Sequence, residues 1–330
     1  MIAVVHHPDY VAEAPSPSAY RWNKNGLIRD LLQAEGARIE WHQPDAMPRG
    51  WIEAVHDPDY VAEVLSAKVP PEKERRIGFK VNAVMARRSP LVVGGTWLAA
   101  ELALERGYAA NSAGGSHHAL ATTGAGYCIF NDLGIVAVRL VEERMLERVM
   151  VVDCDVHQGD GTAALTAGRA GIATYSIHAE KNFPVRKAHS TLDVALPDGT
   201  GDAAYLDALE STLAPMLDRE RPDIVLYQAG VDPYHDDRLG RLALSENGLV
   251  EREKLVARLM IARGIPLAST VGGGYGEDAL AIARRHVRAI MTLGEAYAGK
   301  VAVAPAVHET RLDTHRPGHK DGATTSTGKC

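Results

Sequence analysis

Residues 151–161 read VVDCDVHQGDG, and they place charged side chains directly after a run of apolar ones. The apolar run RVMVV, at residues 148–152, has the composition of a strand that is buried on both faces. Four ionisable residues then follow within eight positions: Asp153, Asp155, His157 and Asp160. Charged groups beside a buried strand are costly unless they are paired or bind a metal ion. This stretch therefore predicts a metal site at the end of a strand.

The rest of the chain alternates short apolar runs with longer helical patterns. The runs that we expect to form strands are residues 2–5, 108–115, 148–155, 172–178, 223–230 and 265–274. In the segments between them, apolar residues recur at intervals of three and four, as at residues 97–107, 131–146 and 202–220. This alternation predicts an α/β fold with three layers, in which a mostly parallel central sheet carries helices on both faces.

The length and composition favour one catalytic domain. A chain of 330 residues with 46% hydrophobic composition buries a large core, and we expect a single domain over residues 1–300. Residues 301–330 turn polar and are expected to form a largely disordered tail. The segment PPEKERRIGFK, residues 70–80, is charged and carries paired prolines, so we expect an exposed excursion there.

Charge and cysteine content restrict the partners and the compartment. A net charge of -6 leaves no basic excess for nucleic acid, and no apolar window approaches a membrane span. The N-terminus reads as a strand because no basic region precedes its apolar residues. Three irregularly spaced cysteines do not fit a disulfide framework, so we expect a cytoplasmic protein.

Five of the expected strands end in reactive residues, and each does so at its carboxyl end. Besides the cluster after residue 152, these residues are the pair His117 and His118, then His178, Asp232 and Tyr275. The carboxyl ends of parallel strands lie at one edge of the sheet, where ligand crevices form. We therefore expect these side chains to converge.

Asp155, His157 and Asp232 are the predicted metal ligands. Asp155 and His157 are two residues apart in an extended segment, so their side chains leave the same face. With Asp232 as the third ligand, one coordination position stays open, which is typical of catalytic zinc. The same ligands also accept iron(II), manganese or cobalt. The alternative reading is that Asp155 caps a helix and His157 is a core histidine.

The tandem histidines His117 and His118 follow two glycines, in a loop that can approach a ligand closely. Beside a metal-activated water, one imidazole can accept a proton while the other protonates the leaving group. Asp153 and Asp160, which are not assigned to the metal, are available to hold one ring nitrogen each. On its own, a His-His pair is more often a surface feature.

Tyrosines in glycine-bearing loops are candidate substrate contacts. Tyr275 lies within VGGGYGED, where its phenol could donate to a developing oxyanion. A phosphate loop is the competing reading, but the run lacks the lysine and the glycine spacing of such loops; a structural turn is the other alternative. Tyr127 and Phe183 could form the walls of a channel, and core packing remains open for Tyr127.

Five motifs occur in an order that resembles the zinc-dependent histone deacetylase family, which has the arginase/deacetylase fold. They are GGSHHA, GAGYCIFND, DCDVHQGDG, AGVDPYHDDRLGRLALS and VGGGYGED. The resemblance extends to about Ala296. The segments GGSHHA and DRLGRLALSENGLVERE are most similar to the class IV branch and its bacterial relatives.

The resemblance implies a role for each candidate. Zinc would be bound by Asp155, His157 and Asp232, and protons would be transferred by His117 and His118, which Asp153 and Asp160 would support. Tyr275 would polarise the substrate carbonyl. The acyl-lysine channel would be lined by Tyr127, where the family usually has phenylalanine, and by Phe183, Gly126 and Gly273. A monovalent cation such as potassium would be bound by carbonyls around Asp153, Asp155, His157 and Ser176.

These observations predict metal-dependent hydrolysis of the amide in an N-acylated amine, with acyl-lysine as the leading substrate. An acetylpolyamine or another small acyl-amine is the alternative. One rival is a binuclear manganese ureohydrolase, which would need further aspartates where this chain has His118 and either Gly159 or Asp160. The other rival is a non-catalytic protein that binds acylated amines.

Overall fold

The computed structural model describes residues 1–11 and 23–302, and within these residues it contains one sheet of eight parallel strands. The strands are β1 (Ile2–Val5), β2 (Ile39–His42), β3 (Tyr108–Asn111), β4 (Val149–Asp153), β5 (Ile172–Ala179), β6 (Leu192–Leu196), β7 (Ile224–Gln228) and β8 (Leu267–Thr270). Their order across the sheet is β2-β1-β3-β8-β7-β4-β5-β6. The predicted three-layer α/β fold is confirmed, and the sheet is entirely parallel.

All six strands that the sequence predicts are present, and the two that it misses are the two edges of the sheet. β2 pairs with β1 alone, and β6 pairs with β5 alone. Each missed strand is only partly buried: β2 has one buried residue and β6 has one. An edge strand that is half exposed carries too few apolar residues to stand out in a sequence.

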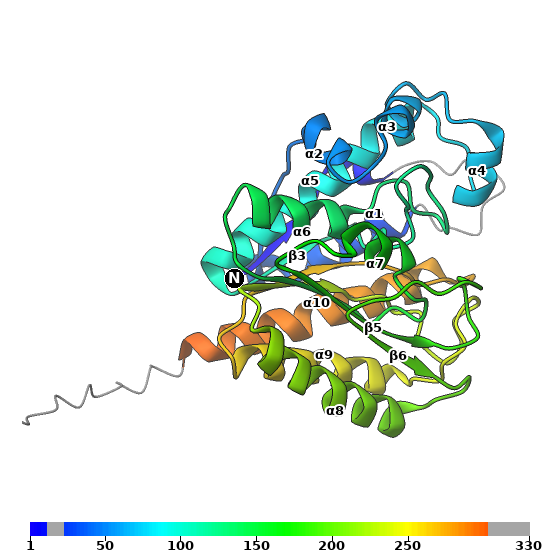
Figure 1. Ribbon diagram of the computed structural model, residues 1–330. Helices are drawn as coiled ribbons and strands as arrows, with labels where there is room; N and C mark the ends of the chain where they lie inside the picture. The colour runs from blue at the N-terminus through cyan, green and yellow to red at the C-terminus, as the bar shows by residue number, and fades with distance from the viewer. Residues whose placement is uncertain (12–22, 303–330) are drawn as a thin grey trace, which may run out of the picture.

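Helices cover both faces of the sheet (Figure 1). The α-helices are α1 (Lys24–Ala34), α2 (Arg49–Glu53), α3 (Pro58–Leu65), α4 (Pro71–Ile77), α5 (Ala83–Arg106), α6 (Asp132–Glu142), α7 (Asp160–Thr166), α8 (Asp202–Glu220), α9 (Glu246–Ile261) and α10 (Ala279–Ala302), and the 3-10 helices are η1 (Pro8–Tyr10) and η2 (Gly36–Arg38). On one face α10 packs against α1 and α9, and on the other α5 packs against α6. No helix among the described residues has the length and apolar character of a membrane span.

The central strands are buried on both faces, and alternate residues therefore enter two different cores. In β4, Met150 and Val152 pack with the α8 and α9 layer, whereas Val149 and Val151 pack with the α5 and α6 layer. A parallel strand covered on both sides reads as a continuous apolar run, which explains the pattern at residues 148–152. Polar side chains appear only where the strand ends at Asp153.

Residues 70–80 are largely exposed, as the sequence predicts, but they are helical in part. They contain the short helix α4, which is anchored by the buried side chain of Ile77 and ends at Gly78 with φ +95°. Tyr127 N donates to Ile77 O at 2.7 Å, so α4 is tied to the loop that precedes α6. Of the predicted tail, residues 303–330 lie outside the described residues, and the single-domain prediction remains a prediction.

Candidate active site

Three buried side chains with metal-binding atoms meet at the carboxyl edge of the sheet. Asp155 and His157 follow β4, and Asp232 follows the adjacent strand β7. One candidate ligand atom from each residue lies within 4.8 Å of the others. His157 Nδ1 lies 2.9 Å from Asp155 Oδ1 and 3.2 Å from Asp232 Oδ2. The three predicted ligands thus converge.

The cluster fits a divalent metal ion. His157 Nδ1 contacts Asp155 Oδ1, and Asp232 Oδ2 is buried without a hydrogen-bond partner. Burial and the charge of Asp155 raise the pKa of Asp232 to about 7, so two carboxylates are crowded without enough positive charge. Zinc–ligand distances of about 2.0–2.2 Å put neighbouring atoms of a tetrahedral site roughly 3.3 Å apart. The observed separations are close to this value.

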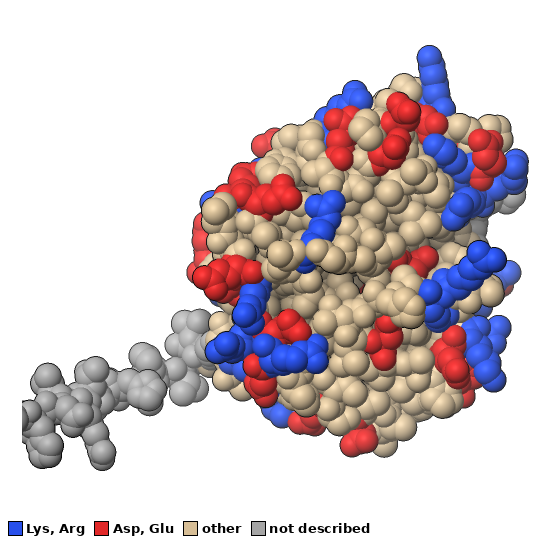
Figure 2. Space-filling model, viewed as in Figure 1, with Lys and Arg blue, Asp and Glu red and all other residues tan. Residues whose placement is uncertain are grey.

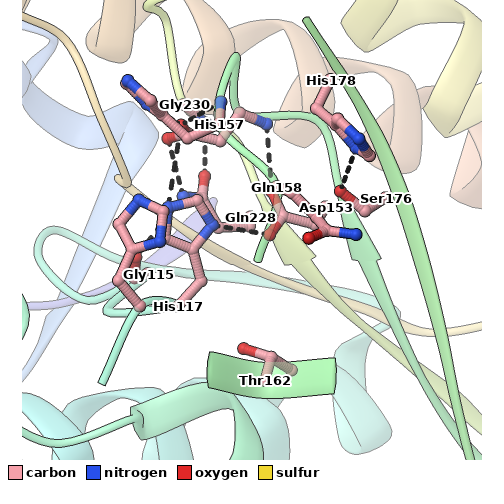
Figure 3. A network of polar contacts seen from close by, with 12 residues as sticks. Gly115, His117, Asp153, His157, Gln158, Thr162, Ser176, His178, Gln228 and Gly230 are labelled. Carbon is pink, nitrogen blue, oxygen red and sulfur yellow. Dashed lines mark hydrogen bonds and ion pairs between the residues drawn. The ribbon is translucent and has the colours of Figure 1, made fainter. Parts of the chain in front are cut away.

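Two groups outside the ligand set orient Asp155. Asp155 Oδ2 accepts from Gln228 Nε2 at 2.8 Å and from the backbone nitrogen of Gly273 at 2.9 Å. The other end of the Gln228 amide accepts from Gly230 N at 2.7 Å. Figure 3 draws Gln228 in one network of polar contacts with Gly115, His157 and Gly230. Gln228 is not among the predicted site residues. Its position as a polar residue at the end of a buried strand could have identified it.

Gly273, which the family resemblance implies as a channel residue, is not among the residues that line the active-site cavity. Gly273 is buried beside the ligands, and a Cβ atom there would lie 2.0 Å from Asp232 Oδ2 and 2.6 Å from Asp155 Oδ2. The position therefore requires glycine because the two carboxylates occupy the space of a side chain. Gly273 thus packs directly against two of the metal-binding carboxylates.

His117 and His118 lie beside the cluster, and each contacts a carboxylate through Nδ1. His117 Nδ1 lies 2.7 Å from Asp153 Oδ2, and His118 Nδ1 lies 2.7 Å from Asp160 Oδ1. This is the pairing that the family resemblance implies. The Nε2 atom of His117 lies 3.7 Å from Asp155 Oδ1, so it faces the metal-binding cluster. A carboxylate on Nδ1 fixes the tautomer and leaves Nε2 to exchange protons.

The two histidines have opposite pKa shifts. Burial alone would lower the pKa of His117, but the charges of Asp153 and Asp155 outweigh burial and raise this pKa to about 9. Burial, followed by repulsion from His117, lowers the pKa of His118 to about 4. A bound divalent ion would oppose the protonation of His117. The pair therefore holds two imidazoles with different affinities for a proton.

The loop that carries the histidine pair is held by a buried aspartate at the start of α6. Gly114 and Gly115 adopt φ values of +83° and +81°, which other residues rarely adopt. Asp132 Oδ2 then accepts from Gly115 N at 3.0 Å, and its Oδ1 accepts from Ser116 N at 2.7 Å. Thr96 donates a third hydrogen bond to the same carboxylate. Asp132 was not singled out in the sequence.

A cavity of about 320 Å³ leads to the site. Its lining includes Gly126, Tyr127, Phe183, His118, His157 and Tyr275. Phe183 is exposed, whereas His118 and His157 are buried. The ring of Phe183 lies 4.8 Å from that of His118, and the ring of Tyr275 lies 5.7 Å from that of Tyr127 and 6.2 Å from that of His157. The predicted channel aromatics and Tyr275 thus lie around one cavity.

Gly126 permits the close approach of the loop to His118. Its φ is +51°, and a Cβ atom there would lie 2.6 Å from His118 Cδ2 and 3.2 Å from the Phe183 ring. Tyr127 also has a positive φ, +65°. Two successive residues in this conformation turn the chain back on itself and direct Tyr127 along the cavity.

His178 does not join the cluster. Its Nδ1 lies 3.0 Å from Ser176 Oγ on the same strand, and Figure 3 shows the two side chains on β5, apart from His117 and His157. Burial lowers the pKa of His178 to about 4. Of the residues expected around a monovalent cation, Ser176 lies beside Asp153 in the register of β4 and β5.

Arg252, on α9, connects the two loops that carry the metal-binding residues. Its fully buried guanidinium donates from Nη1 to Cys154 O at 3.0 Å and to Gly230 O at 2.7 Å. Its partner Glu253 accepts from Tyr227 OH at 2.7 Å. Cys154 lies between Asp153 and Asp155, so Arg252 helps to fix the backbone that carries these two aspartates. The sequence gives no local signal for this role because the contacts are distant along the chain.

Comparison with known proteins identifies the family. A family model described as the histone deacetylase domain matches residues 19–291. The chain belongs to this family. The match includes every strand and site residue described here except β1.

Among related proteins, the chain is 43% identical over 286 residues to an uncharacterized protein of Picosynechococcus sp., covering 86% of this chain and 95% of that protein. It is 34% identical over 186 residues to histone deacetylase 2 of Arabidopsis thaliana, covering 56% of this chain and 48% of that one. It is 30% identical over 221 residues to the acetoin utilization protein AcuC of Staphylococcus aureus, covering 60% and 56%. The match spans about half the length of these two named relatives.

Solved structures share the fold at low identity. The HD domain of HDA15 superposes with a TM-score of 0.74 at 19% identity, over 91% of this chain and 92% of that one. An acetylpolyamine aminohydrolase from Burkholderia pseudomallei superposes with a TM-score of 0.73 at 22% identity, over 89% and 99%. These likenesses establish the α/β architecture of the chain.

Proposed function

We propose that the protein is a metal-dependent amidohydrolase that removes acyl groups from N-acylated amines, with acyl-lysine as the substrate class. The observation that carries the proposal is the buried Asp155, His157 and Asp232 cluster next to two carboxylate-bound histidines. Amide hydrolysis requires a polarised carbonyl, a base for water and an acid for the departing amine. Membership of the histone deacetylase domain family supports the same chemistry.

Zinc is the proposed metal, held by Asp155, His157 and Asp232. Two carboxylates and one imidazole leave one of four coordination positions for substrate or water, and iron(II), manganese and cobalt are the alternatives. When bound, the divalent ion supplies a Lewis acid that polarises a carbonyl and makes water more acidic. A potassium-like ion held by backbone carbonyls around Asp153, Asp155, His157 and Ser176 belongs to the same proposal.

The protein's own residues would move the protons and orient the substrate. The acyl-amine enters between Tyr127 and Phe183, and the Tyr275 hydroxyl donates to the carbonyl oxygen as negative charge develops there. One of His117 and His118 takes a proton from the attacking water through Nε2. The other delivers a proton to the amine nitrogen as the C–N bond breaks. Water and amide are thereby converted to a carboxylic acid and a free amine.

The compartment and the branch are further parts of the proposal. A cytoplasmic location is supported by the few, irregularly spaced cysteines, two of which are buried and free. Membership of the class IV branch, together with its bacterial relatives, is supported by the sequence of residues 237–253.

Metal removal tests the proposed function. The purified protein is assayed on a fluorogenic acetyl-lysine peptide before and after treatment with a chelator, and metal content is measured in parallel. We expect about one zinc per chain, loss of at least about 90% of turnover after chelation, and recovery when zinc is added back. Turnover that survives complete metal removal would disprove the mechanism, and two manganese ions per chain would favour the ureohydrolase rival.

A further inference from the structure

A second cavity lies beside the active-site cavity and shares part of its lining. The second cavity, of about 560 Å³, shares Arg75, Arg76 and Phe183 with the first. It is also lined by Arg186 and Lys187, which follow Phe183 in the loop after β5. We call Arg75, Arg76, Arg186 and Lys187 the basic rim. A substrate whose acyl-lysine enters the channel would place its neighbouring residues against this rim.

The basic rim forms no direct ion pairs within the part of the chain that the structure describes. Arg75, Arg76 and Arg186 are exposed, and none of the four rim residues forms an ion pair with a carboxylate of the described residues. By contrast, Lys73 on the same helix pairs with Glu63 at 2.6 Å. In Figure 2, Lys and Arg side chains gather along the right-hand side over α4 and the loops below it. The local charge is therefore the reverse of the net charge of -6.

Carboxylates near the two cavities are already engaged. Among the described residues that line them, Asp160 is the one carboxylate, and its Oδ1 contacts His118 Nδ1. Asp237, near the mouth, accepts from the backbone nitrogens of Leu239, Gly240 and Tyr275. Lys187 donates to the carbonyl oxygens of Asn182 and Pro184, so it is held in place by neutral groups. Asp160, Asp193 and Glu180 attract Lys187, so the three exposed arginines of the rim supply the positive charge that is left for a ligand.

We propose, on the basis of the proposed function, that the basic rim selects acyl-lysine substrates that carry Asp or Glu beside the modified lysine. An extended peptide advances about 3.3 Å per residue, so side chains one to three positions away reach the shared edge of the two cavities. The acylated nitrogen is uncharged, and discrimination falls on these flanking groups. The same rim repels a polyamine, whose remaining amines are cationic.

Matched peptides test this selection. Three acetyl-lysine peptides carry Asp, Gln or Arg at the two positions on each side of the lysine, and N-acetylspermidine is assayed beside them. We expect kcat/KM for the Asp peptide to exceed that for the Gln peptide by at least about fivefold, with the Arg peptide and N-acetylspermidine lower still. The difference should shrink in 0.5 M salt, because the charges are exposed to solvent.

Charge-removing variants link the preference to the rim. The double variant Arg75→Gln/Arg76→Gln and the single variant Arg186→Gln should each lower the Asp-to-Gln ratio of kcat/KM, the double variant by about threefold or more. The control is Arg219→Gln/Arg258→Gln, which removes two arginines that are each 60% exposed, near the ends of α8 and α9 that precede β7 and β8. The control should keep the wild-type ratio.

The outcomes separate this inference from the proposed function. If the Gln peptide is hydrolysed but the Asp peptide is no better, or if N-acetylspermidine is the better substrate, the rim proposal is wrong and the amidohydrolase stands. If no peptide is hydrolysed, fluorescently labelled versions of the same peptides are used, and their binding affinities are compared by fluorescence polarisation. Tighter binding of the Asp peptide then supports the rim while the proposed function fails, and equal binding of the Asp and Arg peptides overturns the rim.

Discussion

Tyr275 lines the active-site cavity, and its proposed role depends on its hydroxyl. Its ring lies 6.2 Å from the ring of His157. Its backbone nitrogen donates to Asp237 Oδ2 at 2.6 Å, which fixes the loop after β8 independently of the phenol. The loop should therefore keep its place when only the hydroxyl is removed.

Tyr275→Phe should lower kcat by about 100- to 1,000-fold, which is typical for the loss of one oxyanion donor. Zinc content should stay near the wild-type value, since the ligands are untouched. The matched control is Tyr297→Phe, which removes a hydroxyl that donates to Ile265 O at 2.8 Å, at the opposite edge of the sheet. Steady-state kinetics and metal analysis report both quantities. Near-full turnover of Tyr275→Phe would exclude the proposed role.

At the residue scale, the sequence identifies side chains with reactive chemistry but not the groups that orient them. Asp155 and His157 stand out because charge follows an apolar strand. Gln228, Asp132 and Arg252 are ordinary polar residues in the sequence. Their roles come from contacts with partners that are far away along the chain, at sequence separations of 73, 16 and 98 positions, respectively. Such contacts leave no periodic pattern along the chain.

Helix α9 carries a buried ion pair that supports the floor of the site. Arg252 and Glu253 are at most 1% exposed, and Arg252 also donates to two carbonyl oxygens in the ligand-bearing loops. Breaking a buried pair by removing one partner leaves an uncompensated charge. The same helix carries an exposed pair, Lys254 with Glu251, which provides a matched comparison.

Arg252→Met should reduce the free energy of unfolding by about 3–5 kcal/mol, because Glu253 would then be buried without its cation. Lys254→Met should cost less than about 1 kcal/mol. The double variant Arg252→Met/Glu253→Met should be more stable than Arg252→Met alone. Urea unfolding of the metal-free proteins measures all three. A loss below about 1 kcal/mol for Arg252→Met would contradict the buried-pair interpretation.

At the element scale, prediction follows burial. The six strands inside the sheet are read correctly because both their faces are covered, whereas β2 and β6 are missed because each has an open edge. Residues 71–77 look like an exposed excursion because six of the seven are charged or proline. The structure turns them into a helix whose arginines lie at the mouth of the site.

The molecule as a whole contains histidines that fold in the neutral form. His56 is buried, its Nδ1 lies 2.9 Å from Leu120 O, and its Nε2 accepts from Asn131 N at 2.9 Å. A second proton on this ring would meet the Asn131 N–H. Burial lowers the pKa of His56 to about 4. Acid therefore acts on the fold at a position away from the metal-binding cluster.

We expect His56 to lower the stability of the metal-free protein as the pH falls from about 6.5 to about 4. Asp232 and Asp237, whose pKa values are raised to about 7 and about 6, act in the opposite direction, so the contribution of His56 is measured as a difference between the wild type and a His56 variant. In this range the unfolded chain binds a proton at His56 that the folded chain does not, since the unfolded pKa is about 6.5. Each such histidine contributes a slope of at most about 1.4 kcal/mol per pH unit. Urea unfolding between pH 4.5 and 7.5 should give a shallower slope for His56→Gln than for the wild type. Identical slopes would refute the prediction.

The sequence by itself determined the parallel α/β layering and the edge of the sheet at which the reactive residues gather. Both follow from local patterns, namely apolar runs covered on two faces and polar residues where those runs end. The tertiary structure decided how these residues are oriented, that Gly273 packs against the metal-binding carboxylates, and that basic side chains line the two cavities. These features depend on contacts between segments far apart in the chain, and only folding brings such segments together.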